Sequence, residues 1–131
     1  MTIADALAHH PARTTFDLAE LRRAIEAVNA CSVQCSLCAD SDLARDPAGM
    51  ADCIRRCLDC ADIAATTARI LSRPTPNGHA WRGLVEACAL ACAECAAACR
   101  AHDHPCCQAC AAACTEAEQA LQQLLAAATD A

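Results

Sequence analysis

The sequence is poor in the residues that build sheets and turns. Its 131 residues include no tyrosine, one tryptophan, one phenylalanine and three glycines, and no run of alternating β-branched residues occurs. Strands favour aromatic and β-branched side chains in alternation, whereas alanine-rich segments without glycine favour helix. We therefore expect an all-α protein, and a chain of this length is sufficient for one domain with a real core.

Three further absences exclude whole classes of function. The chain has no lysine, and its ten arginines are scattered over a sequence of net charge −6, so the basic patch of a nucleic-acid-binding protein is missing. No segment approaches the roughly 20 charge-free apolar residues of a membrane-spanning helix. No Glu-x-x-His pair occurs, which argues against the di-iron sites of some helical bundles. We expect neither a nucleic acid nor a membrane as a partner.

Cysteine, by contrast, is abundant. The chain has 14 cysteines, a density typical of disulfide-rich secreted proteins. Its N-terminal sequence shows no basic segment followed by an apolar stretch of signal-peptide length and no twin-arginine pair, so we expect a cytoplasmic protein. Thiols in a reducing compartment stay free and are more often metal ligands than crosslinks. Among so many thiols no single catalytic triad stands out, and we expect a metal-binding protein rather than an enzyme.

The cysteines recur in steps of three and four residues. The motif Cys-x-x-x-Cys-x-x-Cys occurs three times and its inverse once, at residues 31–38, 53–60, 88–95 and 107–114. Such steps place side chains on one face of a helix. In the first helix the cysteines continue an apolar stripe that runs from Leu18 through Leu21 and Ile25 to Val28. The thiols are therefore expected on the faces that point into the core.

Four long helices are predicted, with short connections between them. Their expected bounds are residues 15–43, 47–72, 76–102 and 105–128, after a lead segment at residues 1–13. Thr14 or Thr15 is expected to cap the first helix. Asp46-Pro47 and Thr75-Pro76 predict helix starts, because proline is favoured just after a cap. Short connections favour an antiparallel, up-down-up-down four-helix bundle.

The four rows of thiols are expected to meet at one end of this bundle. They lie in the C-terminal halves of the first and third helices and in the N-terminal halves of the second and fourth. In an up-down-up-down bundle these four halves lie at the same end. The opposite end then holds an ordinary core of leucine, isoleucine and valine, so the apoprotein is expected to fold without metal.

Rows of thiolates select Cu(I), Zn(II) or iron–sulfur clusters. Zinc and iron–sulfur sites usually take isolated sets of four ligands, often from loops, and a buried four-thiolate zinc site keeps an unfavourable charge. Cu(I) accepts two or three thiolates and bridging sulfur, which fits a continuous row at on the order of one Cu(I) per cysteine, or about fourteen ions per chain. Storage of Cu(I) is the preferred interpretation. A zinc or iron–sulfur protein and a thiol–disulfide redox module remain the alternatives.

The repeated cysteine motifs on all four helices resemble those of the bacterial copper storage proteins, specifically their cytosolic group. The resemblance covers residues 16–128. It implies a homotetramer of cysteine-lined four-helix bundles that keeps many Cu(I) ions bound to thiolates. The lining positions that match are Cys31, Cys35, Cys38, Cys53, Cys57, Cys60, Cys88, Cys92, Cys95, Cys99, Cys107, Cys110 and Cys114. Cys106 also belongs to the predicted ligand set, but it departs from the inward periodicity and is expected at the mouth or rim.

The turn at residues 101–105 is the candidate mouth through which copper enters. Met50, His102 and His104 are candidate ligands there, because the predicted topology places them at the thiol-lined end and their side chains can bind and release a metal ion. A copper chaperone or a small thiol is a candidate donor. Asp42 and Asp103 are interpreted as helix caps rather than ligands.

Overall fold

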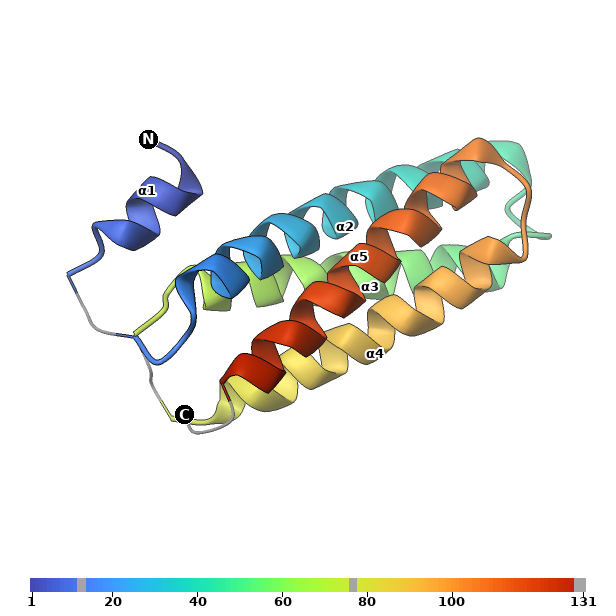
Figure 1. The fold of residues 1–131 in the computed structure, drawn as a ribbon. Helices are drawn as coiled ribbons and strands as arrows, with labels where there is room; N and C mark the ends of the chain where they lie inside the picture. Colours follow the sequence, from blue (N-terminus) through green and yellow to red (C-terminus); the bar gives the residue numbers. More distant parts are fainter. Residues whose placement is uncertain (12–13, 76–77, 129–131) are drawn as a thin grey trace.

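The structure is a computed structural model that describes residues 1–11, 14–75 and 78–128 (Figure 1). It consists of helices α1 (Ile3–Ala8), α2 (Leu18–Arg45), α3 (Ala51–Leu71), α4 (Ala80–Arg100) and α5 (Pro105–Ala127). The described part of the chain contains no strand. This confirms the prediction of an all-α fold.

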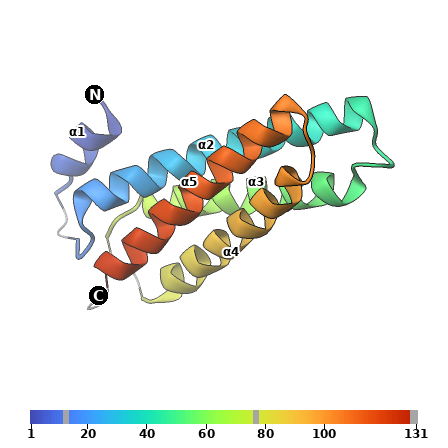
Figure 2. The same ribbon diagram turned by 45° about the vertical axis from the view of Figure 1, so that its right-hand side comes forward.

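The four long helices form an antiparallel bundle, and α1 lies outside it at one end (Figure 1). Each long helix packs against the next one in the sequence, and α2 also packs against α5, which closes the bundle. Successive helices run in opposite directions, as Figures 1 and 2 show. The α2–α3 and α4–α5 connections therefore lie at the same end, which is the arrangement that the thiol rows require.

The first long helix begins at Leu18 and not at residue 15. Asp17 is its N-cap, and the carboxylate of Asp17 accepts a hydrogen bond from the Glu20 N–H at 3.0 Å, so neither Thr14 nor Thr15 serves as the cap. The helix continues to Arg45, two residues beyond the expected end.

The start of α3 also differs from the expectation, because it begins at Ala51, four residues after Pro47. Asp46 instead organises a turn over residues 47–50, in which its carboxylate accepts the Gly49 N–H at 3.1 Å. A Cβ at position 49 would collide with that carboxylate unless the Asp46 side chain moved, so glycine suits this turn.

The start of α4 differs from the expectation by four residues, whereas α5 starts where it was expected. Helix α4 begins at Ala80 rather than at residue 76, and its N-cap, His79, makes no side-chain capping bond. Pro76 lies outside the described residues. Helix α5 starts at Pro105, where proline in the first turn does not sacrifice a helical hydrogen bond. Within the lead segment, α1 is closed by a capping box in which Thr2 and Asp5 bond reciprocally.

The core of the bundle has two chemically different halves. We call the half that contains all the cysteines the thiol half and the other the leucine half. The leucine half is centred on the buried side chains of Leu21, Ile25, Leu71, Val85, Leu121 and Leu124. Phe16 and Trp81 meet edge to face beside it, with ring centroids 4.7 Å apart. Leu18, expected inside, is 41% exposed because it is the first residue of α2, at the margin of the bundle.

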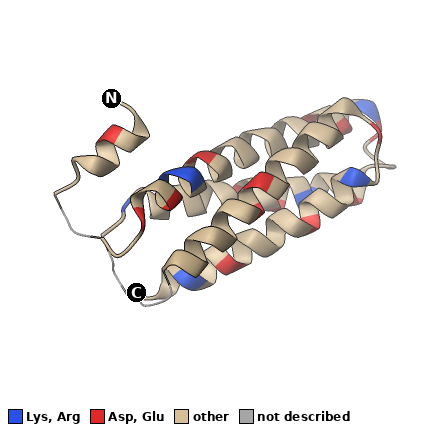
Figure 3. Ribbon diagram, in the orientation of Figure 1, with Lys and Arg blue, Asp and Glu red and all other residues tan. Residues whose placement is uncertain are grey.

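Charged side chains are spread along the helices, with both signs interspersed (Figure 3). Arg23 of α2 pairs with Glu116 of α5 at 2.9 Å. Arg56 of α3 pairs with Asp52 at 3.1 Å and with Glu94 of α4 at 3.4 Å. These exposed pairs contribute little to stability, because solvent screens them. Among the described residues no helix is both long and apolar enough to span a membrane.

Candidate metal centre

The cysteines of all four long helices meet inside the thiol half. Thirteen of the fourteen side chains are buried, Cys106 is partly exposed, and all fourteen are free thiols. Burial of the sulfurs follows from the sequence, because steps of three and four residues keep them on the same faces as the leucines. The predicted ligand residues are thus brought together in one place.

Cys31 is the hub of the inner part of this cluster. Its Sγ atom lies 3.6 Å from that of Cys114, 3.7 Å from that of Cys60, and 3.8 Å from those of Cys35 and Cys92. These neighbours come from α2, α3, α4 and α5, so every helix of the bundle contributes a sulfur to the same small volume. Cys88 lies one helical turn before Cys92 and forms the inner end of the row.

The middle of the cluster is equally dense. The Sγ atom of Cys35 lies 3.5 Å from that of Cys114, 3.6 Å from that of Cys110 and 3.8 Å from that of Cys95. Cys95 in turn lies 3.7 Å from Cys57. The sulfur of Cys35 therefore has close sulfur neighbours on the helices opposite it, in both directions along the bundle axis.

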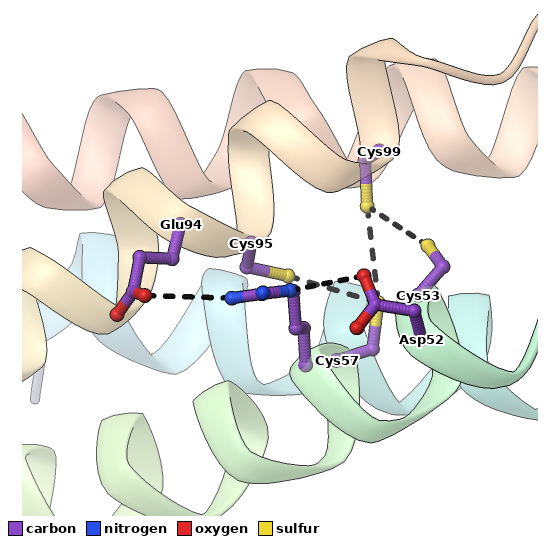
Figure 4. A network of polar contacts seen from close by, with 7 residues as sticks. Asp52, Cys53, Cys57, Glu94, Cys95 and Cys99 are labelled. Carbon is purple, nitrogen blue, oxygen red and sulfur yellow. Dashed lines mark hydrogen bonds and ion pairs between the residues drawn. The ribbon is translucent and has the colours of Figure 1, made fainter.

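Towards the loops the row continues between α3 and α4, where Figure 4 shows Cys53 and Cys57 pointing toward Cys99. Both Sγ–Sγ distances are 3.8 Å. Beside these sulfurs the exposed guanidinium of Arg56 pairs with Asp52 of α3 and with Glu94 of α4, which ties the two helices together; both carboxylates are labelled in Figure 4. The ion pairs lie outside the cluster and leave its interior to thiols.

The outermost part of the row contains an oxygen ligand as well as sulfur. Cys38 and Cys107 approach each other at 3.9 Å, and the carboxylate of Asp42 accepts weak hydrogen bonds from both thiols at 3.8 Å. Cys106 stands at the rim, 3.9 Å from both Cys107 and the same carboxylate. The guanidinium of Arg45 reaches the Cys106 sulfur at 3.9 Å.

The interpretation of Asp42 as a helix cap is wrong. Its side chain is wholly buried inside the last turn of α2, and its carboxylate faces thiols instead of a helix end. The sequence did contain a signal, because Cys31, Cys35, Cys38 and Asp42 follow one another in steps of four, three and four. Asp42 therefore continues the row of ligands. Asp103 is exposed in the turn before α5.

The ligand atoms form overlapping sets. Five groups of four lie with all their ligand atoms within 4.8 Å of one another, and each group shares two members with the next. In order along the bundle they are Cys31, Cys35, Cys60 and Cys114; Cys35, Cys95, Cys110 and Cys114; Cys57, Cys95, Cys99 and Cys110; Cys38, Cys53, Cys57 and Cys99; and Cys38, Asp42, Cys53 and Cys107. The cluster is thus one continuous row.

Sharing of sulfurs decides which metal chemistry fits this row. A Zn–S bond of about 2.3 Å places the sulfurs of a tetrahedral site about 3.8 Å apart, so distance alone would also permit zinc. Closed zinc sites, however, need four ligands each, and eight of the sulfurs here belong to two sets at once. Sulfurs that bridge neighbouring ions suit Cu(I), which needs only two or three thiolates.

Burial keeps three thiols of the outer part of the row protonated in the absence of metal. It raises the pKa of Cys38 and of Cys53, and it raises the pKa of Cys107 to about 12. The cause is the loss of hydration that an ionised sulfur would suffer in the bundle. A monovalent ion that replaces each proton leaves the core close to neutral, so filling the row with Cu(I) adds little buried charge.

Cys106 differs from the other thiols in its exposure, since it is the one cysteine of the fourteen that is not fully buried. Although partial burial by itself raises the pKa of Cys106, hydrogen bonds with Ser41, Cys107 and Arg45 outweigh it and lower the pKa. Cys106 is thus the most solvent-accessible thiol of the row.

The candidate ligands at the mouth lie at the expected end of the bundle. Met50 is the N-cap of α3 and is 5% exposed, packed into the core of the thiol half. His102 and His104 are half-buried in the α4–α5 connection, where His104 is the N-cap of α5 and makes no side-chain capping bond. Their role as copper ligands stays a prediction.

An all-helical bundle with a continuous buried row of free thiols defines a thiolate-based metal-binding protein. The chain belongs to the copper storage protein family, because the family model for copper storage proteins matches residues 17–126. Family membership confirms the prediction of copper storage over the zinc, iron–sulfur and redox alternatives. No curated protein matches the sequence significantly.

Solved structures of copper storage proteins are similar over three quarters of this chain or more. A copper storage protein from Streptomyces lividans loaded with 10 copper equivalents is 39% identical, covers 96% of this chain and 99% of its own, and superposes with a TM-score of 0.92. A structure of a cytosolic copper storage protein from the same organism with five coppers is 40% identical, with 82% and 93% covered and a TM-score of 0.79. The Cu(I)-bound copper storage protein BsCsp3 is 30% identical, with 77% and 93% covered and a TM-score of 0.71.

Proposed function

We propose that this chain stores Cu(I) in the cytoplasm as a row of thiolate-bridged ions along the axis of the thiol half. The observation that carries the proposal is the overlap of the five ligand sets, each of which shares two members with the next. If each thiolate bridges two ions and each ion takes two thiolates, the capacity is on the order of fourteen Cu(I) ions per chain. The S. lividans relative that was loaded with 10 copper equivalents supports a capacity of this order.

Storage rather than catalysis is the role that fits the burial of the sulfurs. Five cavities on the described part of the chain are lined by residues other than cysteine. Thirteen of the thiols are buried against one another, which suits small metal ions as the bound species. Cytoplasmic location is supported by the fourteen free thiols and by the relative described as a cytosolic copper storage protein.

Copper enters, in this proposal, through the turn at residues 101–105. Cys106 at the rim, with His102, His104 and Met50 nearby, supplies exchangeable ligands between solvent and the row. A copper chaperone or a small thiol delivers the ion, since free Cu(I) binds soft sulfur ligands strongly. Each ion that binds a thiol releases one proton to solvent.

Assembly into a homotetramer is supported by apolar side chains that the single chain leaves on its surface. Val33 and Leu37 lie one turn apart on α2 and are each 60% exposed, and Leu90 of α4 is 62% exposed. Exposed apolar residues that gather on a helix face are typical of subunit contacts. Light scattering tests this part of the proposal by giving the mass of the assembly.

Anaerobic titration of the fully reduced apoprotein with Cu(I), against a competing chelator, tests the proposed function. We expect tight uptake of about ten or more ions per chain. The double variant Cys92→Ser and Cys95→Ser lowers this capacity and leaves the helix content unchanged by circular dichroism, whereas the control Ser36→Ala, on the exposed face of α2, leaves both unchanged. Tight uptake of no more than about four ions, the content of a single cluster, would contradict storage.

A further inference from the structure

Asp42 is a buried carboxylate that the thiol row alone does not explain. The residue is fully buried in the last turn of α2. Its two carboxylate oxygens lie 3.8 Å from the Cys38 and Cys107 sulfurs and 3.9 Å from the Cys106 sulfur. A buried aspartate is rare in proteins unless it is paired with a cation or with strong hydrogen-bond donors.

The partners of this carboxylate in the protein are weak. In the described parts of the chain, the hydrogen bonds to its oxygens come from thiols, and an S–H group is a poor donor. The nearby guanidinium of Arg45 contacts the Cys106 sulfur at 3.9 Å and remains exposed. Among the described residues this carboxylate has no ion-pair partner, and a bound cation would supply one.

The ligand atoms around Asp42 have the arrangement of a metal site. Cys38, Asp42, Cys53 and Cys107 offer three sulfurs and one oxygen within 4.8 Å of one another, from α2, α3 and α5. Cys38 and Cys53 also belong to the adjoining all-sulfur set with Cys57 and Cys99. The site is thus the last member of the row and shares an edge with the interior.

We propose that Asp42, Cys38, Cys53 and Cys107 form a mixed carboxylate–thiolate copper position at the mouth that exchanges its ion faster than the all-thiolate interior. This inference rests on the proposed function, because it assigns one position within the same store. Cu(I) is a soft ion that binds thiolate more strongly than carboxylate oxygen. Replacing one sulfur by Asp42 therefore weakens the hold on the outermost ion.

Shared ligands give the ion a route in both directions. An ion at the mixed position can bind Cys38 and Cys53 while it exchanges Asp42 and Cys107 for Cys57 and Cys99, so it is never without thiolate ligands. Movement outward reverses the exchange and ends on the carboxylate, the weakest ligand of the row. The position serves both as the first site to receive copper and as the first to release it.

The sequence offers a direct test, because a thiol at position 42 would extend the row at the same helical spacing. Wild type, Asp42→Cys, Asp42→Asn and the control Asp40→Asn are loaded anaerobically with Cu(I) and mixed with an excess of the Cu(I) chelator bathocuproine disulfonate. Asp40 is exposed two residues earlier on the same helix, so its variant changes charge without changing the site. Stopped-flow absorbance records the release of copper.

We expect wild type and Asp40→Asn to show a fast phase of about one ion per chain before slower release of the rest. Asp42→Cys makes the outermost position all-thiolate, and its fast phase slows by about tenfold or more. Asp42→Asn loses the charged ligand and retains about one ion fewer. Difference infrared spectra show a shift of a carboxylate stretching band on copper loading in wild type and Asp40→Asn, and no such shift in the two Asp42 variants.

Two results would overturn the assignment. One is release from Asp42→Cys with the same fast phase as wild type, and the other is a wild-type infrared spectrum whose carboxylate bands do not change on loading. Both measurements remain decisive if Asp42→Asn does not fold, because neither of them uses that variant. Failure of the proposed function is a different outcome, in which all variants, wild type included, take up no more than about four ions.

Discussion

The two halves of the bundle are built by the same helices and on the same periodicity, yet they differ in what they fill the core with. The leucine half buries branched side chains such as Leu21, Leu71 and Leu121, and the thiol half buries small cysteines instead. A buried methylene contributes about 0.8 kcal/mol to stability. The leucine half therefore supplies the larger share of the stability of the apoprotein, and the thiol half gives up part of that contribution to hold metal.

The largest expected effect is a loss of stability, without loss of copper capacity, when a core residue of the leucine half is truncated. Leu121 is fully buried in the leucine half, so Leu121→Ala is expected to lower the free energy of unfolding by about 2–5 kcal/mol. Copper capacity stays unchanged, because no ligand is lost. Urea unfolding and Cu(I) titration measure the two quantities, and Leu58→Ala, at an exposed position of α3, is the control. A parallel loss of copper ions in Leu121→Ala would show that the halves are not separable.

A substitution in the thiol half is expected to lower the copper capacity while it changes the stability of the apoprotein only slightly. Cys31→Ala removes the sulfur that lies within 3.8 Å of four others, and the capacity is expected to fall by at least about one ion. The free energy of unfolding of the apoprotein falls by only about 1 kcal/mol, since a small side chain is replaced by a slightly smaller one. Unfolding of the apoprotein by urea and chelator-competed titration of copper give both values. An unaltered capacity would argue against Cys31 as a bridging ligand.

Alkaline pH is expected to act on the thiol half alone. Burial raises the pKa of Cys38, Cys53 and Cys107 above the ordinary thiol value of 9.0. Above this pH the unfolded chain loses protons that the folded chain keeps, so the stability of the apoprotein falls as the pH rises from about 9 towards about 12. The copper-loaded protein has already lost these protons and is expected to change much less. Thermal unfolding of both forms over this range, under reducing conditions, measures the difference.

The smallest effect is expected outside the core. Arg56→Ala removes two exposed ion pairs, to Asp52 and Glu94, that link α3 and α4 beside the sulfurs. The free energy of unfolding is expected to change least of all in this variant, because solvent screens exposed ion pairs, and the copper capacity is expected to remain the same. A loss of copper ions in this variant would indicate that the surface pairs hold the sulfur row in position.

The fold and most of the ligand row could be predicted from the sequence because both depend on helical periodicity. Steps of three and four residues fixed which side chains share a face, and the position of each motif within its helix fixed which end it occupies. Neither inference needs the details of packing. This is why the row from Cys31 to Cys114 appears where the motifs placed it.

Two features that were predicted wrongly depend on which of several possible partners a side chain takes. Asp46-Pro47 is a common helix start, but the Asp46 carboxylate accepts the N–H of Gly49 in a turn, and α3 begins only at Ala51. Asp42 is of a residue type that often caps helices, yet it continues the spacing of Cys31, Cys35 and Cys38, and its side chain contacts Cys38 and Cys107. Residue preference near a helix end does not decide between these possibilities, because the same carboxylate can cap a helix, close a turn or face the core.

The central claim is that copper occupies one continuous row confined to the thiol half. Anomalous scattering at the copper absorption edge, from crystals of the fully loaded protein, tests it most directly. The predicted result is a file of closely spaced copper peaks from Cys88 at the inner end to Asp42 and Cys106 at the mouth, with none in the leucine half. Isolated copper ions that share no sulfur, or copper bound mainly on the outer surface of the bundle, would contradict it.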